Sequence, residues 1–179
     1  MKFIKEITIS DGQTKTGNND KYLKMIWEPN KNDIGTDQKW VKHPKGGDYR
    51  KWFGNVDNVI DWSLDARQHY RKDRVARILP EYLWWKEGVC WTLVTSAKQS
   101  FRYVSKDEIF NLAAPTLFPK EEKFTKPLLA FLNTPIAQYA ANVLNPTLNM
   151  NVGDIQNLPF IYSENNIIEV NTKKCVNIS

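Results

Sequence analysis

The sequence predicts an α+β fold, in which a mixed, mostly antiparallel β-sheet is joined by one basic helix and a C-terminal pair of apolar helices. Most of the chain consists of short runs rich in Val, Ile, Tyr, Phe and Trp, and Gly, Pro, Asn and Asp separate these runs, a pattern typical of strands and turns. Two stretches, residues 63–78 and 126–144, instead combine helical periodicity with N-cap residues.

The composition indicates a folded domain with an anionic partner. The 179 residues, 41% hydrophobic and 25% charged, suffice for one domain with a core or for two small lobes. A net charge of +5 and a pI of about 9.1 favour an anionic partner. Cys90 and Cys175 belong to no C-x-x-C or Cys/His cluster, so neither a zinc site nor a disulfide framework is indicated. No apolar run approaches a membrane span, and we expect a cytoplasmic protein without a membrane partner.

The first third of the chain is predicted to be rich in strands. Alternating apolar and polar residues predict a strand over residues 3–9, and a second strand over 22–28 ends at Pro29. A polar loop follows over residues 30–39, and V-D-N-V-I-D-W at 56–62 predicts a further strand.

A basic helix is predicted after these strands. Ser63 is its expected N-cap, and Pro80 closes it after residue 78. The spacing i, i+4, i+7 places Arg67, Arg71 and Arg74 on one stripe of this helix. Guanidinium groups bind phosphate or guanine bidentately, which favours DNA contact, and a solvated helix with salt bridges is the alternative.

The second half of the chain is predicted to contain strands and then two helices. Strands are expected over residues 82–88, 89–95 and 101–104, and over 107–119 with an interruption at Pro115.

Two consecutive apolar helices are then expected between residues 126 and 144. The first ends near Asn133, and the second begins with Thr134 as N-cap and Pro135 in its first turn. Residues 149–160 return to strand and turn, and the polar tail 163–179 is weakly β.

The segment K-G-G-D-Y-R-K-W-F-G-N, residues 45–55, concentrates glycines, cations and aromatic rings, and we call it the glycine-rich segment. Its glycines tolerate positive φ and allow close approach of a backbone or a ligand. Cations beside flat rings on such a frame suit nucleic acid, whose phosphates are anionic and whose bases stack. The candidate DNA contacts in it are Lys45, Gly46, Gly47, Tyr49, Arg50, Lys51 and Trp52. The alternative is a hairpin with core rings and solvated cations.

A smaller basic site flanks the turn S-A-K-Q-S at residues 96–100. Lys98 and Arg102 are its candidate DNA contacts, and an ordinary hairpin is the alternative unless this site joins the others.

No common catalytic motif is present in the sequence, whether phosphate cradle, nucleophile elbow or zinc-protease motif. His43 and His69 are interpreted as surface residues. The adjacent carboxylates Asp107 and Glu108 are expected to point apart into solvent, so we predict no acid–base pair there.

Five motifs, in order, span nearly the whole chain. They are K-T-G-N-N-D-K-Y-L, the glycine-rich segment, E-G-V-C-W-T-L-V-T-S, F-R-Y-V with I-F-N-L-A-A-P-T-L-F-P, and L-L-A-F-L-N-T-P through L-N-P-T-L-N-M-N-V-G-D-I-Q-N-L-P-F. Together they resemble the target-recognition (specificity) region of PglX-type adenine-specific DNA methyltransferases in BREX phage defence and of related type IIG restriction-modification enzymes. Residues 65–80 depart from that pattern, because they are richer in arginine.

The resemblance implies that the chain is a specificity fragment of a longer parent. Residues 1–162 would form a DNA target-recognition domain, and residues 163–179 would lead into the remainder. The fragment itself would be no enzyme and would hold no cofactor. S-adenosylmethionine would bind the methyltransferase core of the parent, where adenine is methylated, and whether the parent also cleaves DNA stays open. The expected partners are double-stranded DNA and that core.

The resemblance also implies a division of roles on the DNA-facing side. Arg50 and Lys51 would hold phosphate, whereas the arginine stripe would distinguish bases. Two other classes of protein stay open. A single-stranded nucleic-acid binder would stack bases on Tyr49, Trp52 and Trp40. A protein-interaction module would use Trp84 and Trp85 as an anchor.

Overall fold

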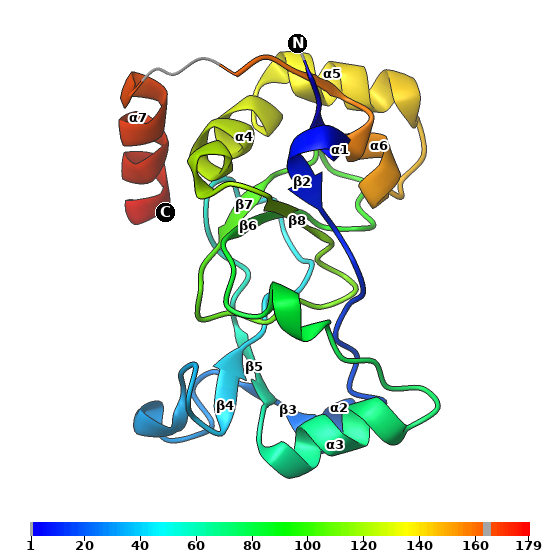
Figure 1. Cartoon of the computed structure of the whole chain (residues 1–179), viewed down its shortest axis with the longest axis vertical. Coiled ribbons are helices and arrows are strands. Elements are labelled where there is room, and N and C mark those ends of the chain that lie inside the picture. The colour runs from blue at the N-terminus through cyan, green and yellow to red at the C-terminus, as the bar shows by residue number, and fades with distance from the viewer. Residues whose placement is uncertain (1, 163–165) are drawn as a thin grey trace.

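The computed structural model describes residues 2–162 and 166–179. It confirms the mixed fold class with antiparallel sheets, since all strand pairs in the described part of the chain are antiparallel. Figure 1 shows an elongated molecule with a helical end, a central sheet and a second, smaller sheet at the other end.

Three sheets make up the β-structure. The central sheet has the order β2 (Thr8–Ile9), β8 (Thr116–Pro119), β6 (Gly88–Cys90) and β7 (Arg102–Val104). The smaller sheet has the order β3 (Leu23–Met25), β5 (Asn58–Asp61) and β4 (Trp40–Lys42). A two-stranded pair joins β1 (Lys2–Phe3) to β9 (Pro159–Phe160).

The helices gather at the two ends of the molecule (Figure 1). The helical end holds α1 (Ile4–Ile7), α4 (Thr125–Leu132), α5 (Pro135–Leu144), α6 (Val152–Gln156) and α7 (Asn166–Asn177). The other end holds α2 (Asn19–Tyr22) and α3 (Leu64–Lys72). Short 3-10 helices lie at η1 (Lys31–Asp33), η2 (Glu81–Leu83) and η3 (Glu122–Phe124). Among the described residues, no helix combines the length and the apolar character needed to cross a membrane.

Two hydrophobic cores lie on opposite sides of the central sheet. The first packs the sheet against α1, α4 and α6 through buried residues that include Ile4, Val89, Trp91, Leu117, Leu128, Leu129 and Ile155. The second lies toward α3 and includes Val41, Ile60, Trp62, Tyr70, Leu79, Ile109 and Phe118. The chain therefore builds two small lobes that share one sheet.

The helices with N-cap residues are confirmed. Ser63 Oγ accepts a hydrogen bond from the amide of Ala66 at the start of α3 (3.4 Å). Thr134 Oγ1 accepts from the amide of Ala137 (3.2 Å), with Pro135 in the first turn of α5. The strands predicted at 56–62 and 101–104 are also confirmed, over shorter ranges.

The predicted strand over residues 3–9 is wrong, because the helical turn α1 interrupts it. The carboxylate of Glu6 accepts a hydrogen bond from the amide of Phe3 (2.7 Å), and this contact caps the turn. Ile4 and Ile7, three residues apart, both enter the first core. The strand predicted over 82–88 is also wrong: η2 and a turn at Trp85 (φ 59°) replace most of it.

The basic helix is shorter than predicted. The carboxylate of Asp73 accepts hydrogen bonds from the amides of Val75 and Ala76 (both 2.8 Å), an alternative to helical bonding that ends α3. Arg74 lies beyond the helix, so the prediction of one helical stripe that includes Arg74 is wrong.

The C-terminal part is more helical than predicted. Residues 149–160 contain α6, at whose start Asp154 accepts from the amide of Asn151 (2.8 Å). The tail forms α7, which packs beside α4 and buries Thr172. Of the predicted weakly β tail, residues 163–165 lie outside the described residues.

We expect alanine to have opposite effects on stability at two glycines. A Cβ at Gly88 in β6 would lie 2.7 Å from Thr116 Cγ2 and 2.9 Å from the carbonyl oxygen of Leu117, so Gly88→Ala should lower the free energy of unfolding by about 1–3 kcal/mol. Gly153 in α6 has no atom within 4 Å of such a Cβ, so Gly153→Ala should raise it by about 0.5–1 kcal/mol. Urea denaturation measures both, and equal signs would contradict the described packing.

Candidate nucleic-acid interface

The glycine-rich segment lies along the edge of the central sheet, beside β7. The amide of Trp52 donates to the carbonyl oxygen of Phe101 (3.0 Å), and the amide of Tyr103 donates to that of Trp52 (2.7 Å). The amide of Arg50 donates to Ser100 Oγ (3.2 Å). The structure therefore brings this segment together with the turn at 96–100, and the two predicted basic sites become one.

The glycines of the segment are required by the packing of the chain on itself. A Cβ at Gly46 would lie 2.8 Å from the carbonyl oxygen of Ala113. Gly47 has a φ of 153°, and both its amide and its carbonyl group form hydrogen bonds with Thr92 Oγ1 (3.3 and 3.2 Å). The close approach that Gly46 permits is therefore to the chain's own backbone.

Several candidate side chains of the segment have internal partners. Lys51 Nζ donates to the carbonyl oxygen of Asn133 (3.2 Å) at the C-terminus of α4, where a cation is favoured. Trp52 (φ 74°) is half-buried against the first core. Partial burial lowers the pKa of Lys45 from its usual range. By contrast, Tyr49 is 49% exposed, and Arg50 and Lys98 are also exposed.

Arg102 is buried, which corrects its assignment as a DNA contact. Its side chain is fully buried, and Nη2 lies 3.4 Å from Thr92 Oγ1. Nε and Nη1 have no hydrogen-bond partner among the described residues. The buried thiol of Cys90 is close by: burial raises its pKa to about 11, and Arg102 acts in the opposite direction. Arg102 is thus a buried residue of β7 whose side chain lies near Thr92 and Cys90.

His43 and Glu108 are also buried, so the prediction that they lie on the surface is wrong. Burial lowers the pKa of His43 to about 4, and the neutral ring contacts the carbonyl oxygen of Ile109 (Nδ1, 2.5 Å) and Asn111 Nδ2 (Nε2, 2.9 Å). Burial raises the pKa of Glu108 to about 7, and Ser105 Oγ donates to its Oε1 (2.7 Å). No group of acidic, His and Cys side chains in the described part of the chain is arranged to hold a metal ion.

A polar pocket of about 220 Å³ lies between the turn at 96–100 and α5. Three amide side chains line it together with Lys98: Gln99, Gln138 and Asn142. Gln99 Oε1 is buried and has no hydrogen-bond partner among the described residues. Side-chain amides pair bidentately with adenine. None of these three amide residues was predicted from the sequence, although polar Gln138 and Asn142 at i, i+4 on an otherwise apolar helix are a usable signal.

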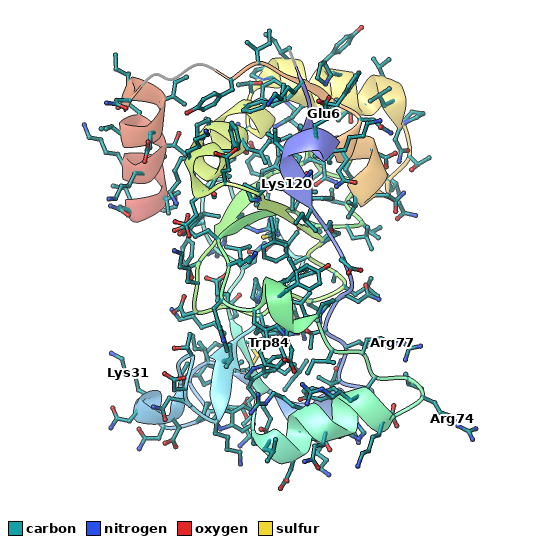
Figure 2. The ribbon with its side chains drawn as sticks, in the orientation of Figure 1. Glu6, Lys31, Arg74, Arg77, Trp84 and Lys120 are labelled. Carbon is teal, nitrogen blue, oxygen red and sulfur yellow. The ribbon has the colours of Figure 1, made fainter. Side chains whose placement is uncertain are left out.

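The arginines of the basic helix lie in the other lobe. Arg67 is half-buried with its guanidinium 5.6 Å from the ring of Trp84, and Arg71 forms an ion pair with Glu81. Arg74 extends into solvent at the end of the molecule away from α5 (Figure 2). The structure therefore does not join these arginines to the glycine-rich segment.

The buried carboxyl of Glu108 predicts that the difference in the free energy of unfolding between Glu108→Gln and wild type depends on pH. Its pKa rises from 4.5 to about 7 on folding, so its contribution to stability is present below pH 4.5 and is lost as the pH rises through 7. The free energy of unfolding of Glu108→Gln should therefore increase relative to wild type by about 1–3 kcal/mol between pH 4.5 and 7.5. His43 contributes the opposite slope in both proteins, because its pKa is lowered on folding, and so it cancels in the difference.

Urea denaturation of both proteins across this pH range measures the difference. Glu121→Gln, which alters an exposed carboxylate, is the matched control and should track wild type closely. A difference between Glu108→Gln and wild type that does not vary with pH would show that Glu108 titrates normally.

Comparison with protein-family models finds no match. Two known proteins are similar to this chain. The adenine-specific methyltransferase BrxX of Escherichia coli O9:H4 (strain HS) is 34% identical over 143 residues, which cover 79% of this chain and 12% of that protein. The adenine-specific methyltransferase PglX of Lacticaseibacillus casei (strain Zhang) is 27% identical over 145 residues, which cover 78% and 12%. The chain thus matches a region of adenine-specific methyltransferases and spans only about an eighth of their length.

Proposed function

We propose that this chain is the DNA target-recognition part of an adenine-specific methyltransferase of the BREX type. The observation that carries the proposal is the joined basic surface, where exposed Arg50 and Lys98 lie near a pocket lined by amides. Cations position a protein on the phosphates, and amides and arginines read base edges. The similarity to BrxX and PglX and the net charge of +5 support the same function.

The residues divide into three roles in this proposal. Arg50 and Lys98 hold phosphate, with Tyr49 beside them. Gln99, Gln138 and Asn142 are the candidate base-reading groups. Lys45, Gly46, Gly47, Lys51 and Trp52 set the backbone of the interface through their internal contacts. Arg74 is a second, separate phosphate contact on the other lobe.

The catalytic steps belong to the parent in this proposal. Its methyltransferase core would bind S-adenosylmethionine and methylate adenine, and this chain alone would transfer no methyl group. The recognition domain would span residues 1–162. The apolar face of α5 favours a protein contact, since Ile136, Tyr139 and Val143 are 77%, 74% and 65% exposed. We assign that contact to the rest of the parent, because the matched relatives extend far beyond the matched region.

We expect duplex DNA binding that depends on salt and on two cations. Arg50→Ala and Lys98→Ala should each weaken binding to any duplex sequence and reduce the slope of log affinity against log salt by about 0.9. Lys31→Ala, which removes an exposed cation from η1 at the other end of the molecule, should have a much smaller effect (Figure 2). Fluorescence anisotropy with a mixed-sequence duplex over a salt series measures this. Salt-insensitive binding, or none at low salt, would overturn the proposal.

The sequence specificity of DNA binding should depend on the amide side chains of the polar pocket. In the full-length parent, Gln138→Leu or Asn142→Leu should cost about 1–3 kcal/mol of binding, mainly on the cognate site, because an amide–base pair is lost. Lys51→Ala should instead lower stability by about 0.5–1 kcal/mol, because it removes the cation at the end of α4, and should leave the motif intact. Methylation-sensitive sequencing of genomic DNA reads the motif. An unchanged motif in both amide variants would reject the pocket as the reading site.

A further inference from the structure

The net positive charge of the chain is concentrated in the lobe of α3. Residues 13–24 and 63–78 together carry eight Lys and Arg residues and three Asp residues, and in the rest of the chain the positive and negative side chains are equal in number. These two segments therefore account for the whole net charge of +5. They contain α2 and α3, at the end of the molecule away from α5 (Figure 1). An anion that approaches this end meets an excess of positive charge.

Two of these cations, Lys15 and Arg77, lie directly opposite each other. The amide of Lys15 donates to the carbonyl oxygen of Arg77 (2.9 Å), and the amide of Arg77 donates to that of Lys15 (2.8 Å). In such an antiparallel pair the two side chains point to the same side of the backbone. Both residues are exposed, and like charges that face each other in this way are destabilising. An anion bound by both side chains removes this repulsion.

The guanidinium of Arg77 is held at one nitrogen and leaves one edge unoccupied. Its Nη1 donates to the carbonyl oxygens of Arg74 (3.0 Å) and Ala76 (2.6 Å), both in the loop that follows α3. Nε and Nη2 of Arg77 have no hydrogen-bond partner among the described residues. These two nitrogens form an edge with which arginine binds two oxygens of one phosphate. The contacts of Nη1 therefore position Arg77 for a bidentate contact with an anion.

No acidic side chain in the described part of the chain forms an ion pair with Lys15 or Arg77. The carboxylate of Asp73 is close enough to interact with Arg77. Hydrogen bonds from the amides of Ala76 and Val75 hold the pKa of Asp73 below its usual range, and Arg77 adds a smaller effect in the same direction. Asp73 is thus bound mainly by backbone N–H groups, so the charges of Lys15 and Arg77 are left for another anion.

We propose that Lys15 and Arg77 together bind one phosphate of the DNA backbone. Figure 2 shows Arg77 on the same side of the molecule as Arg74, so this phosphate site extends the contact already assigned to Arg74. The inference rests on the proposed function and adds to it a two-residue phosphate site on the second lobe. Such a contact positions the protein on the duplex and reads no base. A free phosphate ion has the same chemistry, and the experiment separates the two sources.

The test measures the affinity for a mixed-sequence duplex over a salt series by fluorescence anisotropy. Because Lys15 and Arg77 share one phosphate, the double variant Lys15→Gln, Arg77→Gln should reduce the slope of log affinity against log salt by about 0.9, whereas a loss of about 1.8 would mean two phosphates and reject the shared site. Lys31→Gln, which removes an exposed cation from the opposite side of this lobe, is the matched control and should leave the slope nearly unchanged (Figure 2).

A single substitution keeps the test independent of the structural contacts of Arg77. Lys15→Gln leaves the bonds from Nη1 of Arg77 to the loop in place, and it should still weaken duplex binding. Lys15→Arg keeps the positive charge and should bind as wild type does. Urea denaturation verifies that each variant is folded. Equal affinity of Lys15→Gln and wild type at low salt would contradict a phosphate contact of Lys15.

The outcomes separate this inference from the proposed function. An unchanged slope in the double variant, while Arg50→Ala and Lys98→Ala lower the slope, would overturn the phosphate site and leave the proposed function standing. Absence of duplex binding by wild type would overturn both. Inorganic phosphate, compared with chloride at equal ionic strength, separates the two sources of the anion. A rise in the Tm of wild type that the double variant loses, without any change in the slope for DNA, would assign the site to free phosphate and reject the DNA backbone.

Discussion

The rest of the structure depends on β8, the strand that both cores share. Consecutive side chains of a strand point to opposite faces, so Leu117 enters the first core while Phe118 enters the second and packs against Phe110 at 5.5 Å between ring centroids. Both neighbours of β8, the strands β2 and β6, pair with it through backbone hydrogen bonds. Because its side chains enter both cores, this short strand connects the two lobes.

The sequence predicts elements whose signals are local. Ser63 and Thr134 cap their helices through contacts three residues away, and both starts are correct. The predictions of β-structure for residues 3–9 and for the tail are wrong for different reasons. Ile4 and Ile7 suit both a strand and a helical turn, and the contact of Glu6 with the amide of Phe3 decides between them. The tail carries little periodicity of its own, and its helix α7 packs on α4, which no pattern in the tail reveals.

For the candidate site, composition pointed to two segments that the structure brings together, but it did not predict which of their side chains are buried or bonded inside the protein. Lys51 Nζ donates to the carbonyl oxygen of Asn133 at the end of α4, 82 residues further along the chain. The side chain of Arg102 is fully buried. These internal contacts come from segments that are distant in the sequence. A basic residue next to an aromatic one therefore looks the same in the sequence whether its side chain is exposed or bonded inside the protein. The amides at the polar pocket show the converse error, because Gln138 and Asn142 belong to a helix that was predicted only as apolar.

Net charge alone therefore says little about where the proposed interface lies. The ion pairs of the described residues use Lys39, Lys42, Arg71, Lys106, Lys123 and Lys126. None of them involves Arg50, Lys98 or Arg74 in the described part of the chain. A cation in an ion pair adds little to the positive electrostatic potential at the surface, because the neighbouring carboxylate offsets its charge. Salt screening limits the range of any exposed charge to about 8–10 Å. These ion pairs involve only six of the 25 Lys and Arg side chains, so charge alone does not single out Arg50 and Lys98, and what distinguishes them is their position near the pocket lined by amides.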